Sequence, residues 1–204
     1  MTHIGSKLLA ALLAAMPAAL LAAAGALPAL PGVDWQAAPK PIEDFTLTDQ
    51  AGRAVKFSSL RGKTVLVFFG FTNCPDICPT TMHELHLTSM STRVDVTKLQ
   101  VLMISVDGKR DTPAALRAFL ATQSQRFMAM TGEPAKLTAI AARFPAVFVL
   151  PPEAATARSY NVAHTGAVYL VDAQGRLRAT MSKASVNDMA RATQIVQQGA
   201  TRRG

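Results

Sequence analysis

The chain has 204 residues, a formal net charge of +8 at pH 7 and only two cysteines. Behind an apolar N-terminal segment, about 170 residues remain, which is enough for one domain with one sizeable core. The basic residues are scattered and form no stripe interleaved with aromatic side chains, which argues against nucleic-acid binding. Their charge suits an anionic lipid surface, an acidic protein partner or a simple solvated surface.

The first 30 residues have the pattern of an export segment. Residues 1–7 contain one lysine, and residues 8–30 are almost entirely alanine and leucine. Ala24-Gly25-Ala26 offers a cleavage site of the small-residue type, so residues 1–30 are predicted to be a signal peptide. The run is also long enough to span a bilayer, and a retained anchor would leave the domain outside the cytoplasm. Both alternatives place the cysteines where thiols can be oxidised.

The rest of the chain is predicted to form a linker, one domain and a tail. The linker covers residues 31–40, which are rich in proline and alanine, the domain covers residues 41–198, and a flexible tail covers residues 199–204. From Asp44 to Phe57, apolar and polar residues alternate around a turn, which predicts a β-hairpin at the start of the domain.

Two apolar runs predict the central strands. Thr64–Phe71 has the valine and phenylalanine content of a buried strand, and after Asn73 and Pro75 the chain passes into a helix through Thr80–Leu85. A second buried strand is predicted at Leu99–Val106. The strand–helix–strand order implies parallel strands with covering helices.

The second half of the chain adds helices and strands around this centre. Thr112 and Pro113 predict a helix start, as its cap and its first helical residue. The later predicted elements are a short strand at Phe127–Met130, a helix from Gly132 to Ala142, a proline-containing loop with some strand at Phe144–Ser159, antiparallel strands at Ala167–Val171 and from Leu177 onward, and an amphipathic helix at Ser185–Gln198. The fold class predicted is α/β, with a central mixed sheet flanked by helices and an N-terminal hairpin.

Both cysteines lie where the first central strand gives way to a helix. Three residues separate Cys74 from Cys78, so an early helical turn would place both sulfurs on one face. The N–H groups and dipole of a helix N-terminus favour thiolate, so we expect one or both thiols to have a lowered pKa. Cα atoms at this helical spacing lie roughly 6 Å apart, within the range of a disulfide. The spacing alone allows a metal site, a redox-active pair or a structural disulfide.

The sequence around the cysteines resembles a known family. The stretch from Phe68 to Thr81 reads Phe-Phe-Gly-Phe-Thr-Asn-Cys-Pro-Asp-Ile-Cys-Pro-Thr-Thr and resembles the signature of the Sco/SenC family. Ser105-Val106-Asp107 and Arg110-Asp111-Thr112-Pro113 are also similar to that family, and the resemblance covers residues 39–198. It implies a thioredoxin-like, copper-binding protein that takes part in building the copper site of cytochrome c oxidase.

His164 lies just before a predicted strand, in a stretch that resembles the family's histidine segment. The resemblance implies that His164 completes a copper site with Cys74 and Cys78. Thiolates suit Cu(I), and an imidazole extends the tolerance to Cu(II). The family usually has an acidic residue immediately before this histidine, whereas this chain has Ala163.

Other polar side chains nearby receive structural interpretations. His83 and His86 do not have the spacing of a zinc-protease motif, and both are predicted to be exposed on the helix. Asp76 is predicted to cap the helix or to help dock a partner. Asp107 and Asp111 are predicted to form turns and caps at the sheet edge that carries the cysteines.

Three functions remain open at this point. The first is a copper-binding metallochaperone for cytochrome c oxidase, with a copper-receiving subunit or another copper chaperone as its partner. The second is a thiol–disulfide oxidoreductase that reduces the cysteines of such a partner, and the third is a redox or copper sensor. His164 separates the first two, because a dithiol reductase needs only Cys74 and Cys78. We expect a periplasmic protein, either exported or tethered to the outer face of the cytoplasmic membrane.

Overall fold

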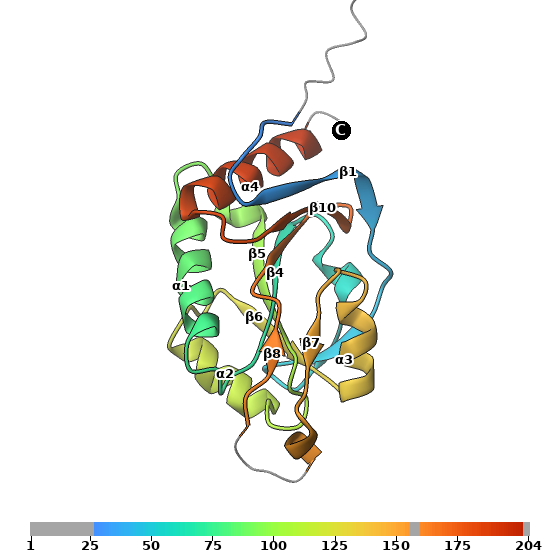
Figure 1. Ribbon diagram of the computed structural model, residues 1–204. Coiled ribbons are helices and arrows are strands. Elements are labelled where there is room, and N and C mark those ends of the chain that lie inside the picture. Colours follow the sequence, from blue (N-terminus) through green and yellow to red (C-terminus); the bar gives the residue numbers. More distant parts are fainter. Residues whose placement is uncertain (1–26, 156–159, 202–204) are drawn as a thin grey trace, which may run out of the picture.

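Two adjacent parallel strands form the centre of the computed structural model, which describes residues 27–155 and 160–201 (Figure 1). Strands β4 (Thr64–Gly70) and β5 (Leu99–Ser105) are buried along their whole length and pair in register from end to end. Continuous runs of branched and aromatic side chains are typical of strands that are covered on both faces. The two predicted central strands are thereby confirmed.

Eight strands make one mixed sheet in the order β1-β10-β9-β4-β5-β6-β2-β3. The strands β4, β5 and β6 are parallel, and the other neighbouring pairs are antiparallel. The remaining strands of this sheet are β1 (Val33–Pro41), β2 (Thr46–Asp49), β3 (Ala54–Lys56), β6 (Met128–Thr131), β9 (Val168–Val171) and β10 (Arg176–Met181). The pairing of β2 with β3 confirms the predicted hairpin, and the sheet confirms the predicted mixed architecture.

A separate two-stranded ribbon lies beside this sheet. It consists of β7 (Phe148–Val149) and β8 (Ala163–His164), which pair antiparallel. The sequence predicted an irregular loop with some strand at Phe144–Ser159, and β7 is the strand within that stretch.

Helices cover both faces of the large sheet. Within the described ranges they are α1 (Ile77–Met90), α2 (Pro113–Ala121), α3 (Pro134–Ala141) and α4 (Val186–Thr201), with short 3₁₀ helices η2 (Phe57–Leu60), η3 (Val96–Lys98) and η4 (Pro152–Ala155). Figure 1 shows α1 and α4 together on one side of the sheet and α3 on the other. Thr112 caps α2 by accepting the N–H of Ala115, and Pro113 occupies the first turn, as predicted. None of the helices described is both long and apolar enough to cross a membrane.

Strand β1 occupies most of the segment that was predicted to be a linker, so the linker prediction for residues 31–40 is wrong. Val33 is buried, and the indole N–H of Trp35 donates to the carbonyl of Pro28 at 2.9 Å. The prolines of this segment are accommodated because β1 is an edge strand whose register shifts between Trp35 and Lys40. An edge strand with such an irregularity does not need every N–H for pairing.

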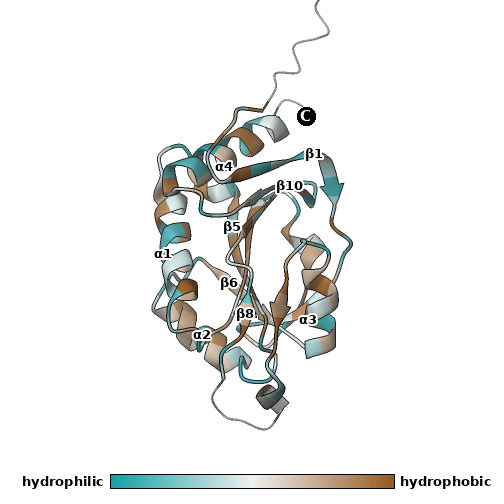
Figure 2. Ribbon diagram, in the orientation of Figure 1, coloured by the Kyte–Doolittle hydropathy of each residue, from teal (hydrophilic) through white to brown (hydrophobic). Residues whose placement is uncertain are grey.

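The hydrophobic core surrounds β4 and β5, and the outer elements are more polar. Figure 2 shows hydrophobic colour along the central strands and hydrophilic colour on β1. Helix α4 continues to Thr201, so residues 199–201 of the predicted tail are helical. Residues 1–26 of the predicted export segment and residues 202–204 lie outside the described part of the chain.

Candidate metal centre

The loop between β4 and α1 carries both cysteines. Cys74 is half-buried in this loop, three residues before α1 begins at Ile77, and Cys78 is buried in the first turn of α1. Cys74 therefore lies just before the helix, as predicted, but the two cysteines do not stack on successive helical turns. Pro75 lies outside the helix, and Pro79 takes the place in the first turn where no backbone N–H is needed.

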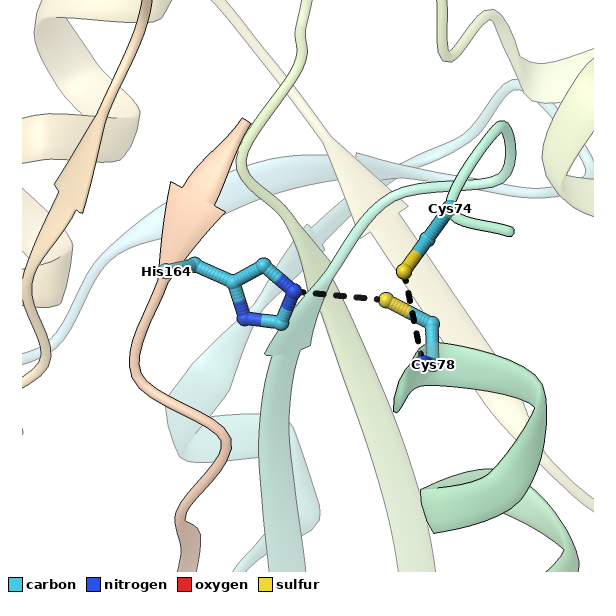
Figure 3. A group of neighbouring side chains, drawn as sticks. All are labelled: Cys74, Cys78 and His164. Carbon is cyan, nitrogen blue, oxygen red and sulfur yellow. Dashed lines mark hydrogen bonds between the residues drawn. The ribbon is translucent and has the colours of Figure 1, made fainter. Parts of the chain in front are cut away.

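Three potential ligand atoms converge at this loop. The Nε2 atom of His164 lies 3.5 Å from the sulfur of Cys78, and the backbone N–H of Cys78 donates to the sulfur of Cys74 at 3.4 Å. The two sulfurs and a ring nitrogen of His164 all lie within 4.8 Å of one another, and Figure 3 shows these side chains pointing toward one another. Donor atoms that share one ion at bond lengths of about 2 to 2.3 Å lie about 3.5 to 4 Å apart. A small closure of this cluster would therefore enclose a metal ion.

The ring of His164 is held with its free nitrogen toward the cysteines. Its Nδ1 lies 3.3 Å from the carbonyl oxygen of Thr165, and because a carbonyl can only accept, Nδ1 carries the hydrogen and Nε2 offers a lone pair. The rings of Phe68 and Phe71 meet the imidazole edge to face, at centroid distances of 5.9 and 5.8 Å. Burial lowers the pKa of His164, partly offset by the Thr165 hydrogen bond, so the imidazole is neutral and able to bind a metal at neutral pH.

The pKa of Cys78 runs against the expectation from the helix N-terminus. Burial raises it far above its usual range, and the neighbouring sulfur of Cys74 raises it further, while a hydrogen bond from the backbone of Phe71 lowers it. The prediction of a lowered pKa is therefore wrong for Cys78, because desolvation of the buried thiolate outweighs the helix N-terminus. Without a metal, Cys78 is a thiol at neutral pH.

Gly70, the last residue of β4, makes room for the Cys78 sulfur. A Cβ atom at position 70 would lie 3.1 Å from that sulfur and 2.5 Å from a ring carbon of Phe68. A side chain at this position would clash with the Phe68 ring on the same strand and would press on the Cys78 sulfur in the first turn of α1. The glycine of the Phe-Phe-Gly-Phe motif is explained by this contact.

The other polar candidates on α1 take no part in the cluster. His83 is exposed, as predicted, whereas His86 is half-buried and meets the ring of Phe127 edge to face at 6.2 Å, so the prediction of an exposed His86 is wrong. Asp76 stands at the N-cap position of α1, but its side chain makes no capping hydrogen bond. A capping role for the Asp76 side chain is therefore not borne out.

The two aspartates after β5 do more than form a turn and a cap. The buried carboxylate of Asp107 pairs with the Arg110 guanidinium and accepts the Tyr160 hydroxyl at 2.7 Å, and the guanidinium stacks on the Tyr160 ring at 3.5 Å. Asp111 is fully buried and hydrogen-bonds to Thr72, in the loop that carries the cysteines. Both contacts join segments that are far apart in the sequence, which the sequence interpretation missed.

The position before His164 is occupied differently from the usual family pattern. Ala163 pairs with Val149 and is exposed, and it offers no side-chain acceptor for the imidazole. The carbonyl of Thr165, on the other side of His164, takes the Nδ1 hydrogen bond. In this chain a backbone carbonyl, in place of an acidic side chain, therefore orients the imidazole of His164.

Comparisons with known proteins agree on one family. The protein-family model described as SCO1/SenC matches residues 34–199. The chain is 33% identical over 135 residues to the SCO2-like protein RC0895 of Rickettsia conorii, covering 65% of each chain. It is 33% identical over 134 residues to the mitochondrial protein SCO1 of Saccharomyces cerevisiae, covering 65% of this chain and 45% of the yeast protein. The chain thus spans less than two thirds of the length of these relatives.

A solved structure points the same way. The structure of Bradyrhizobium japonicum ScoI with copper bound superimposes with a TM-score of 0.66 at 32% sequence identity, covering 76% of this chain and 99% of that one. The superposition supports the predicted thioredoxin-like arrangement of sheet and helices. With the family model matching most of its length, the chain belongs to the SCO1/SenC family.

Proposed function

We propose that this chain is a metallochaperone that carries copper as its cargo, for assembly of the copper site of cytochrome c oxidase. The observation that carries the proposal is the convergence of the sulfurs of Cys74 and Cys78 with a ring nitrogen of His164. Membership of the SCO1/SenC family and the similarity to a copper-bound ScoI support copper over other soft metals.

The three side chains form a ligand set that suits both holding and releasing copper. Thiolates stabilise Cu(I), and the neutral imidazole of His164 extends the set to Cu(II). Cys78 is buried, whereas Cys74 and His164 are only half-buried. A ligand from a partner protein can therefore approach from the half-buried side before the protein's own ligands leave.

We further propose where the protein works and with which partner. The partner is a copper-receiving subunit of cytochrome c oxidase or another copper chaperone, and the domain acts in the periplasm, after export through residues 1–30. Support comes from the alanine- and leucine-rich composition of that segment. The yeast relative is named as mitochondrial, so the periplasmic location is tested directly. A reporter enzyme that is active only after export should gain activity behind residues 1–40, and an inactive fusion would contradict export.

A second candidate function is thiol–disulfide exchange with a partner. Both thiols are free, and the contact between the Cys78 backbone N–H and the Cys74 sulfur keeps the pair close. Closing a disulfide removes both sulfur ligands, so copper binding and disulfide exchange compete for the same atoms. The reductase would need no contribution from His164.

The test is a copper titration of the purified, reduced chain, with thiol counting in parallel. We expect a single copper ion to bind to the parent and none to the oxidised protein. Cys74→Ser and Cys78→Ser should abolish copper binding and disulfide cycling together. His164→Ala should weaken copper binding strongly and leave the dithiol able to cycle.

A matched variant controls for the loss of any histidine. His83→Ala removes an exposed imidazole from α1, five residues after Cys78, and should bind copper as the parent does. If His164→Ala holds copper as tightly as the parent and with the same spectrum, His164 is not a ligand. The dithiol reductase would then be the better account.

A further inference from the structure

Asp111 is a buried carboxylate whose hydrogen bonds reach the cysteine-bearing loop. It is fully buried just before α2. Its two oxygens accept the Thr72 hydroxyl at 2.6 Å, the Thr72 backbone N–H at 3.1 and 3.2 Å, and the Ser105 hydroxyl at 2.7 Å. Thr72 lies 39 residues before Asp111 in the chain, and Ser105 ends the central strand β5. The carboxylate thus connects the loop to the end of the sheet.

Thr72 is followed closely by the first cysteine. The backbone N–H of Cys74 donates to the carbonyl of Phe71 at 3.3 Å, and the backbone of Phe71 also hydrogen-bonds to the Cys78 sulfur. Thr72 lies inside the turn that this Cys74–Phe71 hydrogen bond closes, so a shift of Thr72 would move Cys74 relative to Cys78. The bonds to Asp111 fix Thr72 in both its main chain and its side chain.

The environment of Asp111 differs from that of its neighbour Asp107. Asp107 is paired with the guanidinium of Arg110, which neutralises its charge. Asp111 instead accepts two hydroxyls and one amide, all neutral donors. Burying a carboxyl group without a cationic partner costs free energy, which its hydrogen bonds must offset. For Asp111 those bonds end on the loop that holds the cysteines.

We propose that Asp111 is a positioning residue of the metal centre, whose buried carboxylate clamps Thr72 and so keeps Cys74 in place against Cys78 and His164. The inference rests on the proposed copper function for its effect on metal binding. Its effect on the loop itself is independent of copper.

The clamp requires both oxygens of a carboxylate. The Ser105 hydroxyl already accepts the backbone N–H of Asp107 at 2.9 Å and gives its hydrogen to Asp111. In Asp111→Asn, a single amide oxygen remains to accept what two oxygens accept in the parent. The hydroxyl of Thr72 or of Ser105 then loses its buried acceptor.

The experiment compares Asp111→Asn with the parent, using the full chain. Hydrogen exchange of the segment from Thr72 to Cys74 is measured in the copper-free protein, and copper affinity and the Cu(II)–thiolate absorption spectrum are measured on loading. We expect faster exchange in that segment, a changed spectrum and copper binding at least about tenfold weaker, in line with the loss of partners behind other metal ligands.

Asp172→Asn is the matched control. Asp172 is an equally buried carboxylate, but it accepts Arg176 in the turn between β9 and β10, near the end of the sheet opposite the cysteines. The Asp172→Asn variant should have a lower thermal stability than the parent, with unchanged hydrogen exchange at Thr72–Cys74 and an unchanged copper spectrum. A general loss of stability is thereby separated from a loss of positioning.

Thr72→Val keeps the proposal testable if Asp111→Asn does not fold. It removes the hydroxyl donor and leaves the backbone N–H, so it should give a smaller change in the same direction. Parent-like exchange and a parent-like copper spectrum in the folded variant would overturn the proposal. If the parent itself binds no copper, the proposed function fails, and the exchange measurement still decides whether Asp111 holds the loop.

Discussion

The proton on Cys78 links copper binding to pH. Burial raises the pKa of this thiol, so the copper-free protein carries the proton throughout the neutral range. A metal binds the thiolate, so loading must expel that proton. Lower pH therefore opposes binding, and higher pH favours it.

We predict that copper affinity rises about tenfold per pH unit between about pH 6 and pH 8 from the Cys78 proton alone. Competition titrations against a chelator of known pH dependence would measure the slope. His164→Ala should bind more weakly but with nearly the same slope above about pH 7, because burial lowers the pKa of His164 and leaves its ring already neutral there. An affinity that does not change with pH would mean that Cys78 is not a ligand.

Single residues of the site were predictable where chemistry or motif marks them. The cysteines are the only two in the chain, and the resemblance to a family pointed to His164. The pKa direction of Cys78 was not predictable, since it depends on burial rather than on distance from a helix start. The role of Asp111 was hidden because its partner Thr72 is 39 residues away and nothing local suggests the pairing.

At the scale of elements, the ribbon of β7 and β8 holds the histidine. It pairs only with itself, so the position of His164 depends on few hydrogen bonds. Thr165 supplies several of them: its hydroxyl accepts the Val147 N–H and donates to the Val147 carbonyl, both at 3.0 Å, and its own N–H donates to that carbonyl at 2.9 Å.

Thr165→Val should therefore loosen the ribbon while keeping its shape. Losing two hydrogen bonds of the hydroxyl corresponds to about 1 to 2 kcal/mol of local stability. We expect faster amide exchange at Val147 and weaker copper binding, with little change in global melting. Thr97→Val is the control. It removes a hydroxyl of the exposed η3 that donates to Asp95, and it should change neither the amide exchange at Val147 nor copper binding. Unchanged exchange at Val147 would show that backbone pairing alone holds the ribbon.

Elements with strong patterns were predictable, and those with mixed signals were not. The runs that became β4 and β5 are continuously apolar, and Thr112-Pro113 marks the start of α2 unambiguously. The spacing of Cys74 and Cys78 allowed both to lie in one helical turn, but α1 begins only at Ile77 and leaves Cys74 in the loop. The two-residue strands of the ribbon are too short to produce any periodicity.

At the scale of the whole molecule, the sheet depends on the edge strand β1, whose proline- and alanine-containing sequence is typical of a linker. β1 covers one side of β10 and brings Val33 and the half-buried Trp35 onto the core. Removing β1 would expose the core residues that Val33 and Trp35 cover. It would also leave backbone N–H and C=O groups of β10 without hydrogen-bond partners. The domain boundary therefore lies before residue 33.

We predict that a chain starting at residue 42 is less stable than one starting at residue 27 by about 2 kcal/mol or more, given the apolar surface that β1 covers. Urea unfolding followed by circular dichroism would measure the difference, and self-association of the shorter chain would follow from its open edge. Equal unfolding midpoints would restore the interpretation of residues 31–40 as a linker.

The segment that leads into β1 enters the domain at the top of Figure 1, beside α4, whereas β8 with its histidine lies in the lower half. If the chain is attached to a membrane through its N-terminal side, the attachment and the proposed copper ligand His164 are at opposite ends of the domain. Such an attachment would leave the copper-binding end of the domain accessible to a partner.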